Sequence, residues 1–146
     1  MTYNQLIATL QGLLESHAMI KTVKNLPPTE WLLKDEQPVY PVCCFNVNAG
    51  SFNKGRQQIY SVQFFFLDKA GAEGIFQEEV ISDQVSIAWD IIELIRGTKR
   101  TYYIEDSIQF NTIADKYEDY LAGCEFSTLI TTQSDFDGCD APIQVS

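Results

Sequence analysis

Apolar residues near the N-terminus recur at every third or fourth position, the spacing of one face of an amphipathic helix. The pattern predicts a helix over residues 2–19, with Thr2 as its N-cap. Its apolar face consists of Tyr3, Leu6, Ile7, Leu10, Leu13 and Leu14, and His17 continues the same line. We therefore expect this helix to pack against another element through that face.

Residues 39–47 and 57–69 flank a Gly-, Asn- and Ser-rich turn region and predict two strands. The preceding stretch, 21–38, contains prolines and predicts a loop, with a short strand around Trp31–Leu33. Between the two strands, residues 48–57 are rich in Gly, Asn and Ser, and are longer than a tight hairpin turn requires. We expect them to form a projecting loop.

The strand at 57–69 has two unlike faces. One face is apolar throughout and carries Tyr60, Val62, Phe64 and Phe66. The other begins with Ser61 and Gln63 and ends with Phe65 and Leu67. This change predicts a central strand whose second face is covered only at its far end.

The longest helix is predicted over residues 75–96, with Gly97 as its C-cap. It carries two apolar stripes. One contains Ile81, Val85, Ala88, Ile92 and Ile95, with Trp89 beside it, and the other contains Phe76, Val80, Ile87, Ile91 and Leu94. One stripe should pack on a sheet, and the other needs a partner in the first helix or in a neighbouring subunit.

Two further alternating segments, 106–115 and 124–133, predict two more strands. The order of elements is then helix, two strands, helix, two strands. That order predicts an α+β domain over residues 1–133, with an antiparallel sheet of about four strands and two helices on one face. Residues 134–146 follow the last strand and read as an extended acidic C-terminal arm.

The chain has a formal net charge of −10 and a pI near 4.4, so its surface should repel nucleic acid. No apolar run is long enough to span a membrane, and we expect no membrane partner. The first residues lack the basic and apolar blocks of a secretory signal, which favours a protein made in a cytoplasm.

The four cysteines, at positions 43, 44, 124 and 139, form no CxxC pair for zinc or redox chemistry. Neighbouring side chains of a strand point to opposite faces, so Cys43 and Cys44 cannot serve one site. We interpret the cysteines as small apolar residues in a reducing compartment.

Recognisable catalytic chemistry is missing from the sequence. His17 is the only histidine and lies on the apolar face of a helix, which favours a structural role. No nucleophile-elbow, P-loop or dinucleotide motif is present. The stretch "DFDGCD" (135–140) shares part of a calcium-loop spacing, but the positions of the first Asp and the bidentate Glu hold Gln133 and Gln144. Weak cation binding there and a plain solvated terminus both stay open. We expect neither enzyme activity, nor a cofactor, nor a bound metal.

The order of elements resembles that of the tail-completion or tail-terminator proteins of tailed bacteriophages. The resemblance is carried by the helix "YNQLIATLQGLLESH" (3–17), the hairpin that follows, the helix "EEVISDQVSIAWDIIELI" (78–95) and the late strand "DYLAGCEFSTLI" (119–130). The last stretch is similar to the "LAGW"-like turn of phages of Bacteroidetes, including crAss-like phages, although Cys124 stands where those have Trp.

The resemblance implies a structural virion protein that forms a ring at the head–tail neck, lies between the portal or adaptor and the tail, and is assembled in the host cytoplasm. The ring would hold six or twelve copies, and genomic DNA would pass through it without specific binding. Because contacts in a ring are head-to-tail, we expect subunit contacts in the loop, on the second helical stripe and in the acidic arm. The residues in question are Phe52, Lys54 and Arg56, then Ile87, Ile91 and Leu94, then Asp135, Asp137 and Asp140.

Two alternatives stay open. The first is a small cytoplasmic α+β ligand-binding or regulatory module, with a pocket between sheet and helices lined by Phe64, Phe66, Trp89 and Phe110. The second is a small enzyme without a recognisable motif.

Overall fold

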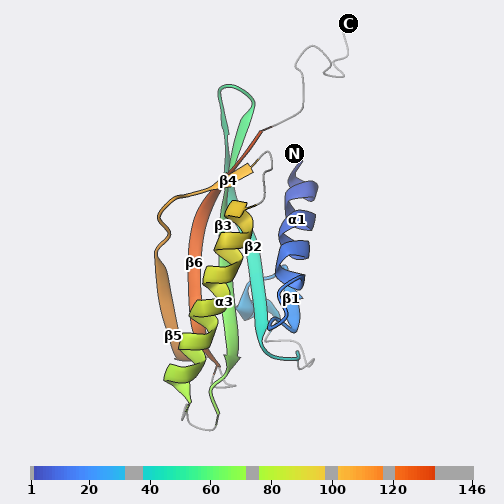
Figure 1. Cartoon of the computed structure of the whole chain (residues 1–146). Helices are drawn as coiled ribbons and strands as arrows, with labels where there is room; N and C mark the ends of the chain where they lie inside the picture. The colour runs from blue at the N-terminus through green and yellow to red at the C-terminus, as the bar shows by residue number, and fades with distance from the viewer. Residues whose placement is uncertain (1, 32–37, 72–75, 98–101, 117–120, 134–146) are drawn as a thin grey trace, which may run out of the picture.

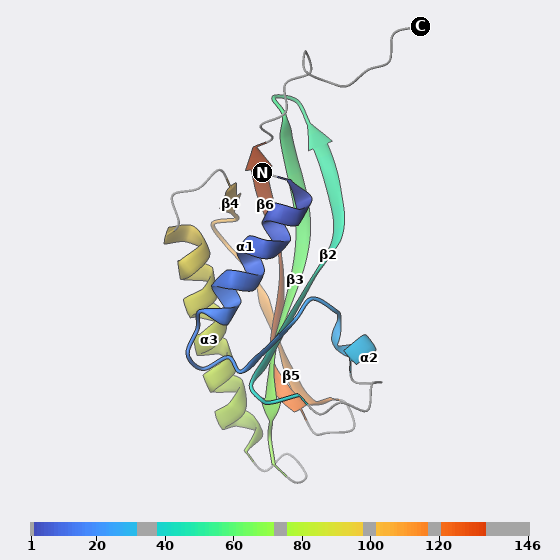
Figure 2. The same cartoon turned by 90° about the vertical axis from the view of Figure 1, so that its right-hand side faces the viewer.

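The computed structural model describes residues 2–31, 38–71, 76–97, 102–116 and 121–133. Two long helices, α1 (Tyr3–Glu15) and α3 (Gln77–Gly97), lie on the same face of one sheet, as the views of Figure 1 and Figure 2 show. A one-turn helix, α2 (Pro28–Trp31), lies on the opposite side. The strands are β1 (Thr22–Lys24), β2 (Val42–Asn53), β3 (Gln57–Lys69), β4 (Tyr102–Ile104), β5 (Phe110–Lys116) and β6 (Leu121–Gln133).

The sheet has six strands in the order β1-β2-β3-β6-β4, with β5 also pairing with β6. β1 runs parallel to β2, and every other pair is antiparallel. The α+β class predicted from the sequence is therefore confirmed. The expected four-stranded, purely antiparallel sheet is wrong. The sequence did not predict β1 and β4, because each is three residues long and too short to show an alternating pattern.

The first helix begins at a capping box. The backbone N–H of Gln5 donates to Thr2 Oγ1 at 3.2 Å, and the backbone N–H of Thr2 donates to Gln5 Oε1 at 2.7 Å. The predicted N-cap is thus confirmed. The helix ends at Glu15 rather than at residue 19. Just after Glu15, the N–H of His17 donates to the carbonyl of Leu14 and the chain turns. Its three fully buried residues are Leu6, Leu10 and Leu14.

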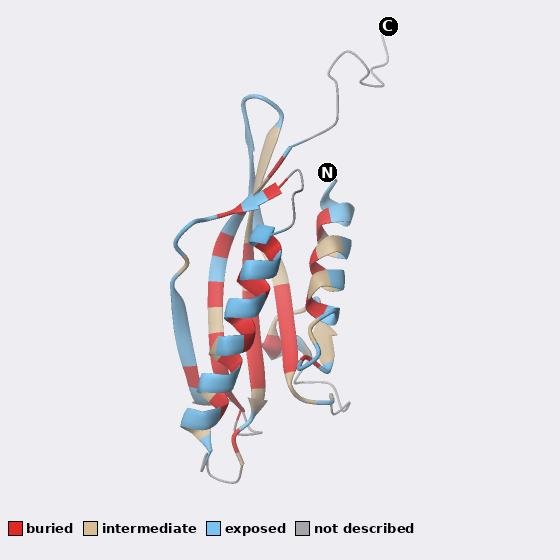
Figure 3. Ribbon diagram, in the orientation of Figure 1, coloured by how far each residue is buried: buried red, intermediate tan, exposed pale blue. Residues whose placement is uncertain are grey.

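The core lies between the two helices and the sheet (Figure 3). A row of phenylalanine rings crosses three strands: Phe64 stacks on Phe45 of β2 at 6.2 Å between centroids and on Phe126 of β6 at 4.9 Å. Such pairs add to the free energy that their area burial supplies, each by about 0.5–1.5 kcal/mol. The predicted apolar face of 57–69 is therefore the core face of a central strand.

The opposite face of the sheet is covered at one end only. There a second apolar cluster is formed by Val42, Cys44, Phe65, Leu67, Ile113 and Leu121, with Leu26 and Tyr40 packed against it. Toward the hairpin, Ser61 and Gln63 are half-buried, and Ser127 and Leu129 are exposed. This confirms the predicted change from polar to apolar along the strand. Cys43 belongs to the first cluster and Cys44 to the second, so the two thiols do lie on opposite faces.

Several predicted boundaries are wrong. Most of the expected loop 48–57 is strand, since β2 continues to Asn53 and β3 begins at Gln57. The short strand expected around Trp31–Leu33 is instead the helical turn α2 as far as Trp31, and the rest of that prediction lies outside the described residues. Pro28 at the start of α2 explains the difference, because proline is pre-organised for the first turn of a helix. The segments 106–115 and 124–133 become β5 and β6 with shifted ends.

The two predicted stripes of α3 form one buried face. Its buried residues come from both stripes and include Ile87 at 4% and Ile91 at 0% exposed. The expectation that these two residues contact another subunit is wrong, because α1 and the sheet already cover them. A helix that crosses a sheet with a second helix beside it has a wide apolar face, which a stripe-by-stripe reading divides in two.

Candidate functional site

The β2–β3 hairpin extends beyond both helices (Figure 1). Its turn is Lys54–Gly55–Arg56, with Gly55 at φ 78° and Arg56 at φ 64°. The side-chain Nε2 of Gln133, at the end of β6, donates to the carbonyl of Gly55 at 2.7 Å and fixes the turn against the neighbouring strand. The hairpin is therefore an ordered arm and not the loop expected from its composition.

The tip of the β2–β3 hairpin carries an apolar residue that is almost fully exposed. Phe52 is 88% exposed and is paired in the ladder with Gln58. Lys54 and Arg56 are exposed beside it. The three contact residues predicted in this region therefore lie together at the tip, where a partner can reach them.

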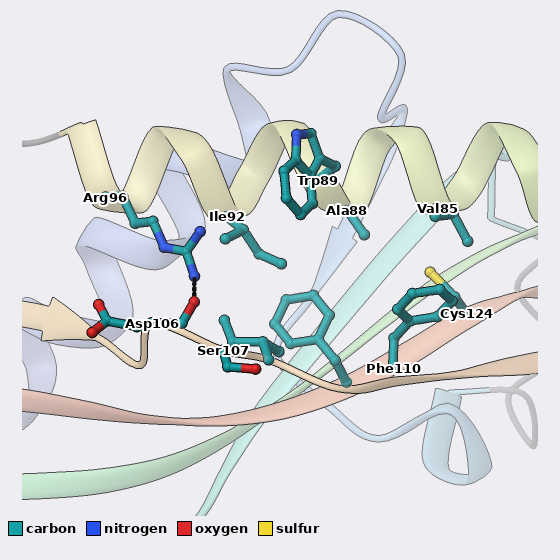
Figure 4. A pocket seen from close by; sticks show the side chains of 11 residues that line it. Val85, Ala88, Trp89, Ile92, Arg96, Asp106, Ser107, Phe110 and Cys124 are labelled. Atoms are coloured by element: carbon teal, nitrogen blue, oxygen red, sulfur yellow. Dashed lines mark hydrogen bonds between the residues drawn. The ribbon is translucent and has the colours of Figure 1, made fainter.

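A pocket of about 270 Å³ lies between α3 and the chain that leads from β4 into β5 (Figure 4). Arg96 closes one end of it: Nη2 donates to the carbonyl of Asp106 at 2.6 Å and to that of Glu105 at 3.0 Å. Its Nη1 lies 3.3 Å from Glu93 Oε1. The walls are mainly apolar and consist of Val85, Ala88, Trp89, Ile92, Ile108, Phe110 and Phe126, with Ser107 and Cys124.

Two aromatic rings of this pocket are largely uncovered: Trp89 is 61% and Phe110 is 52% exposed. The aromatic pocket predicted from the sequence is correct for these two residues only. Phe64 and Phe66 are fully buried in the core and do not line it. Sequence spacing could place the four aromatics on suitable faces, but not decide which rings the packed core would absorb.

The chemistry of the pocket suits binding of an apolar group. Burial, together with the nearby Glu125 carboxylate, raises the pKa of the Cys124 thiol to about 12, so the thiol stays protonated near neutral pH. The Arg96 guanidinium is held by Glu93 and by two backbone carbonyls. Among the described residues, no group of three or more His, Cys, Asp or Glu side chains could hold a metal ion.

The single histidine has an acidic partner that the sequence did not reveal. His17 Nε2 lies 2.9 Å from Asp90 Oδ2, and the N–H of Met19 donates to His17 Nδ1 at 3.1 Å. Since Nδ1 accepts, Nε2 carries the proton that is donated to Asp90. The contact joins the end of α1 to α3. Seventy-three positions separate the partners in the chain, which is why sequence spacing could not find it.

The remaining predicted contact residues differ in placement. Leu94 is 39% exposed on α3 and stays available to a partner. Asp135, Asp137 and Asp140, with the rest of the predicted arm 134–146, lie outside the described residues.

No protein-family model matches the chain, and no curated protein matches it. In the part of the chain that the structure describes, neither long helix combines the length and hydrophobicity needed to cross a bilayer.

Proposed function

We propose that this protein is a structural subunit of a closed ring at the head–tail junction of a tailed bacteriophage. The observation that carries the proposal is the β2–β3 hairpin, which presents the 88% exposed Phe52 beyond the body of the domain. Aromatic residues are enriched in protein interfaces, so an almost fully exposed aromatic on an ordered hairpin supports a surface that a partner buries.

The charge distribution supports a role beside DNA. The outward face of α3 carries exposed carboxylates at Glu78, Glu79, Asp83, Asp90 and Glu93. Wherever that face borders the channel of a ring, it repels the phosphate backbone, and the duplex passes without being held. Such a subunit needs no cofactor, and its neighbours would be the portal or adaptor on one side and the tail on the other.

The experiment that tests this function is native mass spectrometry with negative-stain imaging of the purified chain over a range of concentrations. Rings with a central opening and a mass of six or twelve copies support the proposal. A compact dimer that binds a small molecule contradicts it.

The second candidate, a ligand-binding module, is favoured by the pocket beside Trp89. Its volume of about 270 Å³ lies just below the roughly 300–1,000 Å³ of typical small-molecule sites. Fluorescence of Trp89 in a Trp31→Phe background, titrated with a panel of small apolar and aromatic compounds, tests this candidate. Saturable quenching by one compound at micromolar concentration favours the module over the ring.

A further inference from the structure

We propose that Phe52 at the hairpin tip of one copy inserts into the pocket between α3 and β5 of a neighbouring copy. The inference rests on the proposed ring function and names the contact that would build the ring. The pocket would then be a socket for a side chain of the same protein, and its occupant a second copy of this chain.

The first argument is the state of Phe52. The phenyl ring of Phe52 is almost fully exposed, so it does not fill the pocket of its own chain. Its backbone is nevertheless fixed, because Phe52 pairs with Gln58 and the turn is braced by Gln133 from β6. A rigid aromatic loses little conformational entropy on binding, which is why aromatic residues dominate the energetics of protein interfaces.

The second argument is the size and lining of the pocket. An apolar cavity of about 150 Å³ is sufficient to hold benzene, and this pocket has about 270 Å³. It therefore has room for one phenylalanine ring and part of a neighbouring side chain. Trp89 and Phe110, both more than half exposed, flank the entrance. An inserted phenyl group would bury both side chains and form aromatic pairs with them.

The third argument is charge. Lys54 and Arg56 place two positive charges beside Phe52 in a chain whose net charge is −10. The rim of the pocket carries the exposed carboxylate of Asp106 and the Arg96 guanidinium, which is paired with Glu93 at 3.3 Å, so these three side chains leave one net negative charge. Opposite charges around an apolar contact set its orientation and speed association. A knob with a basic surround therefore fits a socket with an acidic rim.

The two patches are different surfaces of one chain, so a contact that uses one hairpin and one pocket is heterologous. Each copy uses its hairpin toward one neighbour and its pocket toward the other, and such contacts close into a ring or continue as a filament. A symmetric dimer would satisfy the pairing only if each hairpin tip reached the pocket of the other copy, so that both contacts formed at once.

The test is sedimentation velocity of full-length variants. Phe52→Ala removes the knob, and Ser107→Trp plugs the socket from an exposed position in the β4–β5 connection. Each substitution is expected to raise the dissociation constant of self-association by at least about tenfold. Phe76→Ala is the matched control, because Phe76 is also an exposed phenylalanine (55%) but lies at the other end of α3. It should assemble like the wild type.

Mixing the two defective variants gives a second, independent readout. Phe52→Ala retains a socket and Ser107→Trp retains a knob, so the mixture has one functional contact and should stop at a heterodimer. For this readout the plug is Ser107→Phe in a Trp31→Phe background, so that Trp89 is the one tryptophan of each chain, and its emission should shift to shorter wavelength only in mixtures that form this contact.

The outcomes separate this contact from the ring function. Rings that persist in Phe52→Ala, or a mixture that stays monomeric, overturn the contact and leave the ring function standing. A Phe52-dependent association that never closes into rings supports the contact and counts against the ring function. A wild-type chain that remains monomeric at the highest concentration reached, with unchanged Trp89 emission, overturns the contact as well.

Discussion

The carboxylate of Glu105 accepts a hydrogen bond from the backbone N–H of Leu129 at 2.7 Å. On this side of β6, the strand pairs with β4 over residues 130–132 and with β5 over residues 121–126. Glu105 occupies the interval between them, where it also accepts from Thr128 Oγ1 at 3.3 Å. A side chain thus substitutes for a missing strand, next to the connection that forms the wall of the pocket.

The first prediction concerns this substitute. Glu105→Ala should lower the free energy of unfolding by about 1 kcal/mol, because a charge-assisted hydrogen bond to the backbone is lost and water replaces it only in part. Glu105→Gln keeps an acceptor oxygen, so it should lower the free energy of unfolding by less than Glu105→Ala does. Hydrogen exchange at the amide of Leu129 provides the measurement. Unchanged protection of that amide in Glu105→Ala would show that the carboxylate does not hold the strand.

The second prediction uses two glycines with opposite surroundings. A Cβ on Gly123 would lie 1.8 Å from the carbonyl oxygen of Phe66, a backbone atom that cannot move aside. Gly123→Ala should therefore destabilise the fold by about 3 kcal/mol or more, or prevent folding. Gly12, in α1, has nothing within 4 Å of the same position. Gly12→Ala should raise the free energy of unfolding by about 0.5–1 kcal/mol. Urea denaturation of both variants measures these changes.

The third prediction follows from the buried thiols. Burial is the main cause of the raised pKa of Cys124, about 12 against an ordinary 9.0, and burial also raises the pKa of Cys43. Above about pH 9 the unfolded chain loses these protons first, so the free energy of unfolding should fall with rising pH. The slope is about 1.4 kcal/mol per pH unit for each thiol.

Denaturation between about pH 9 and about pH 11 measures this slope. Cys124→Ala is the control, because it removes one of the titrating groups and should give a shallower fall than the wild type. In a Cys139→Ser background, which removes the thiol outside the described residues, the native protein should also resist alkylation at pH 8 until it is unfolded. Rapid alkylation of native Cys124 would contradict its burial.

The fourth prediction concerns the contact between the two long helices. A double-mutant cycle on His17→Ala and Asp90→Ala should give a coupling free energy of about 0.2–1 kcal/mol, since Asp90 is 58% exposed and solvent screens the interaction. The same cycle with Asp83→Ala in place of Asp90→Ala should give no coupling. A coupling free energy near zero for His17 with Asp90 would show that this contact does not hold the two helices together.

The fifth prediction concerns the C-terminal segment. β6 ends at Gln133, and the buried core residues of the described part of the chain all precede it. A chain that ends at Gln133 should therefore keep the circular dichroism spectrum and the melting temperature of the full chain. Under the ring proposal it should assemble less readily, because Asp135, Asp137 and Asp140 are removed from the neighbour they would contact. Loss of folding in the shortened chain would instead assign the segment to the core.

The sequence alone determined the class of the fold and most of its core. The three- and four-residue spacing around Leu6, Leu10 and Leu14 and the alternation of 57–69 follow from the geometry of single elements, so they can be read locally. The change from Ser61 and Gln63 to Phe65 and Leu67 even predicted how far the second face of β3 would be covered. The exposed tip residues Phe52, Lys54 and Arg56 were found for the same reason, since a polar, Gly-rich stretch between strands lies outside the core.

Only the tertiary structure decided the features that depend on distant partners. The strands β1 and β4 carry too few residues for a pattern and exist because β2 and β6 offer them an edge to pair with. For Ile87 and Ile91 the sequence left two partners open, the first helix or a neighbouring subunit, and only the folded chain shows that α1 packs with them. The contacts of His17 with Asp90 and of Glu105 with Leu129, and the pocket beside Trp89, likewise arise only where packing brings separate segments together. Burial and pairing are properties of the assembled chain, and a local period cannot encode which surfaces the rest of the molecule will cover.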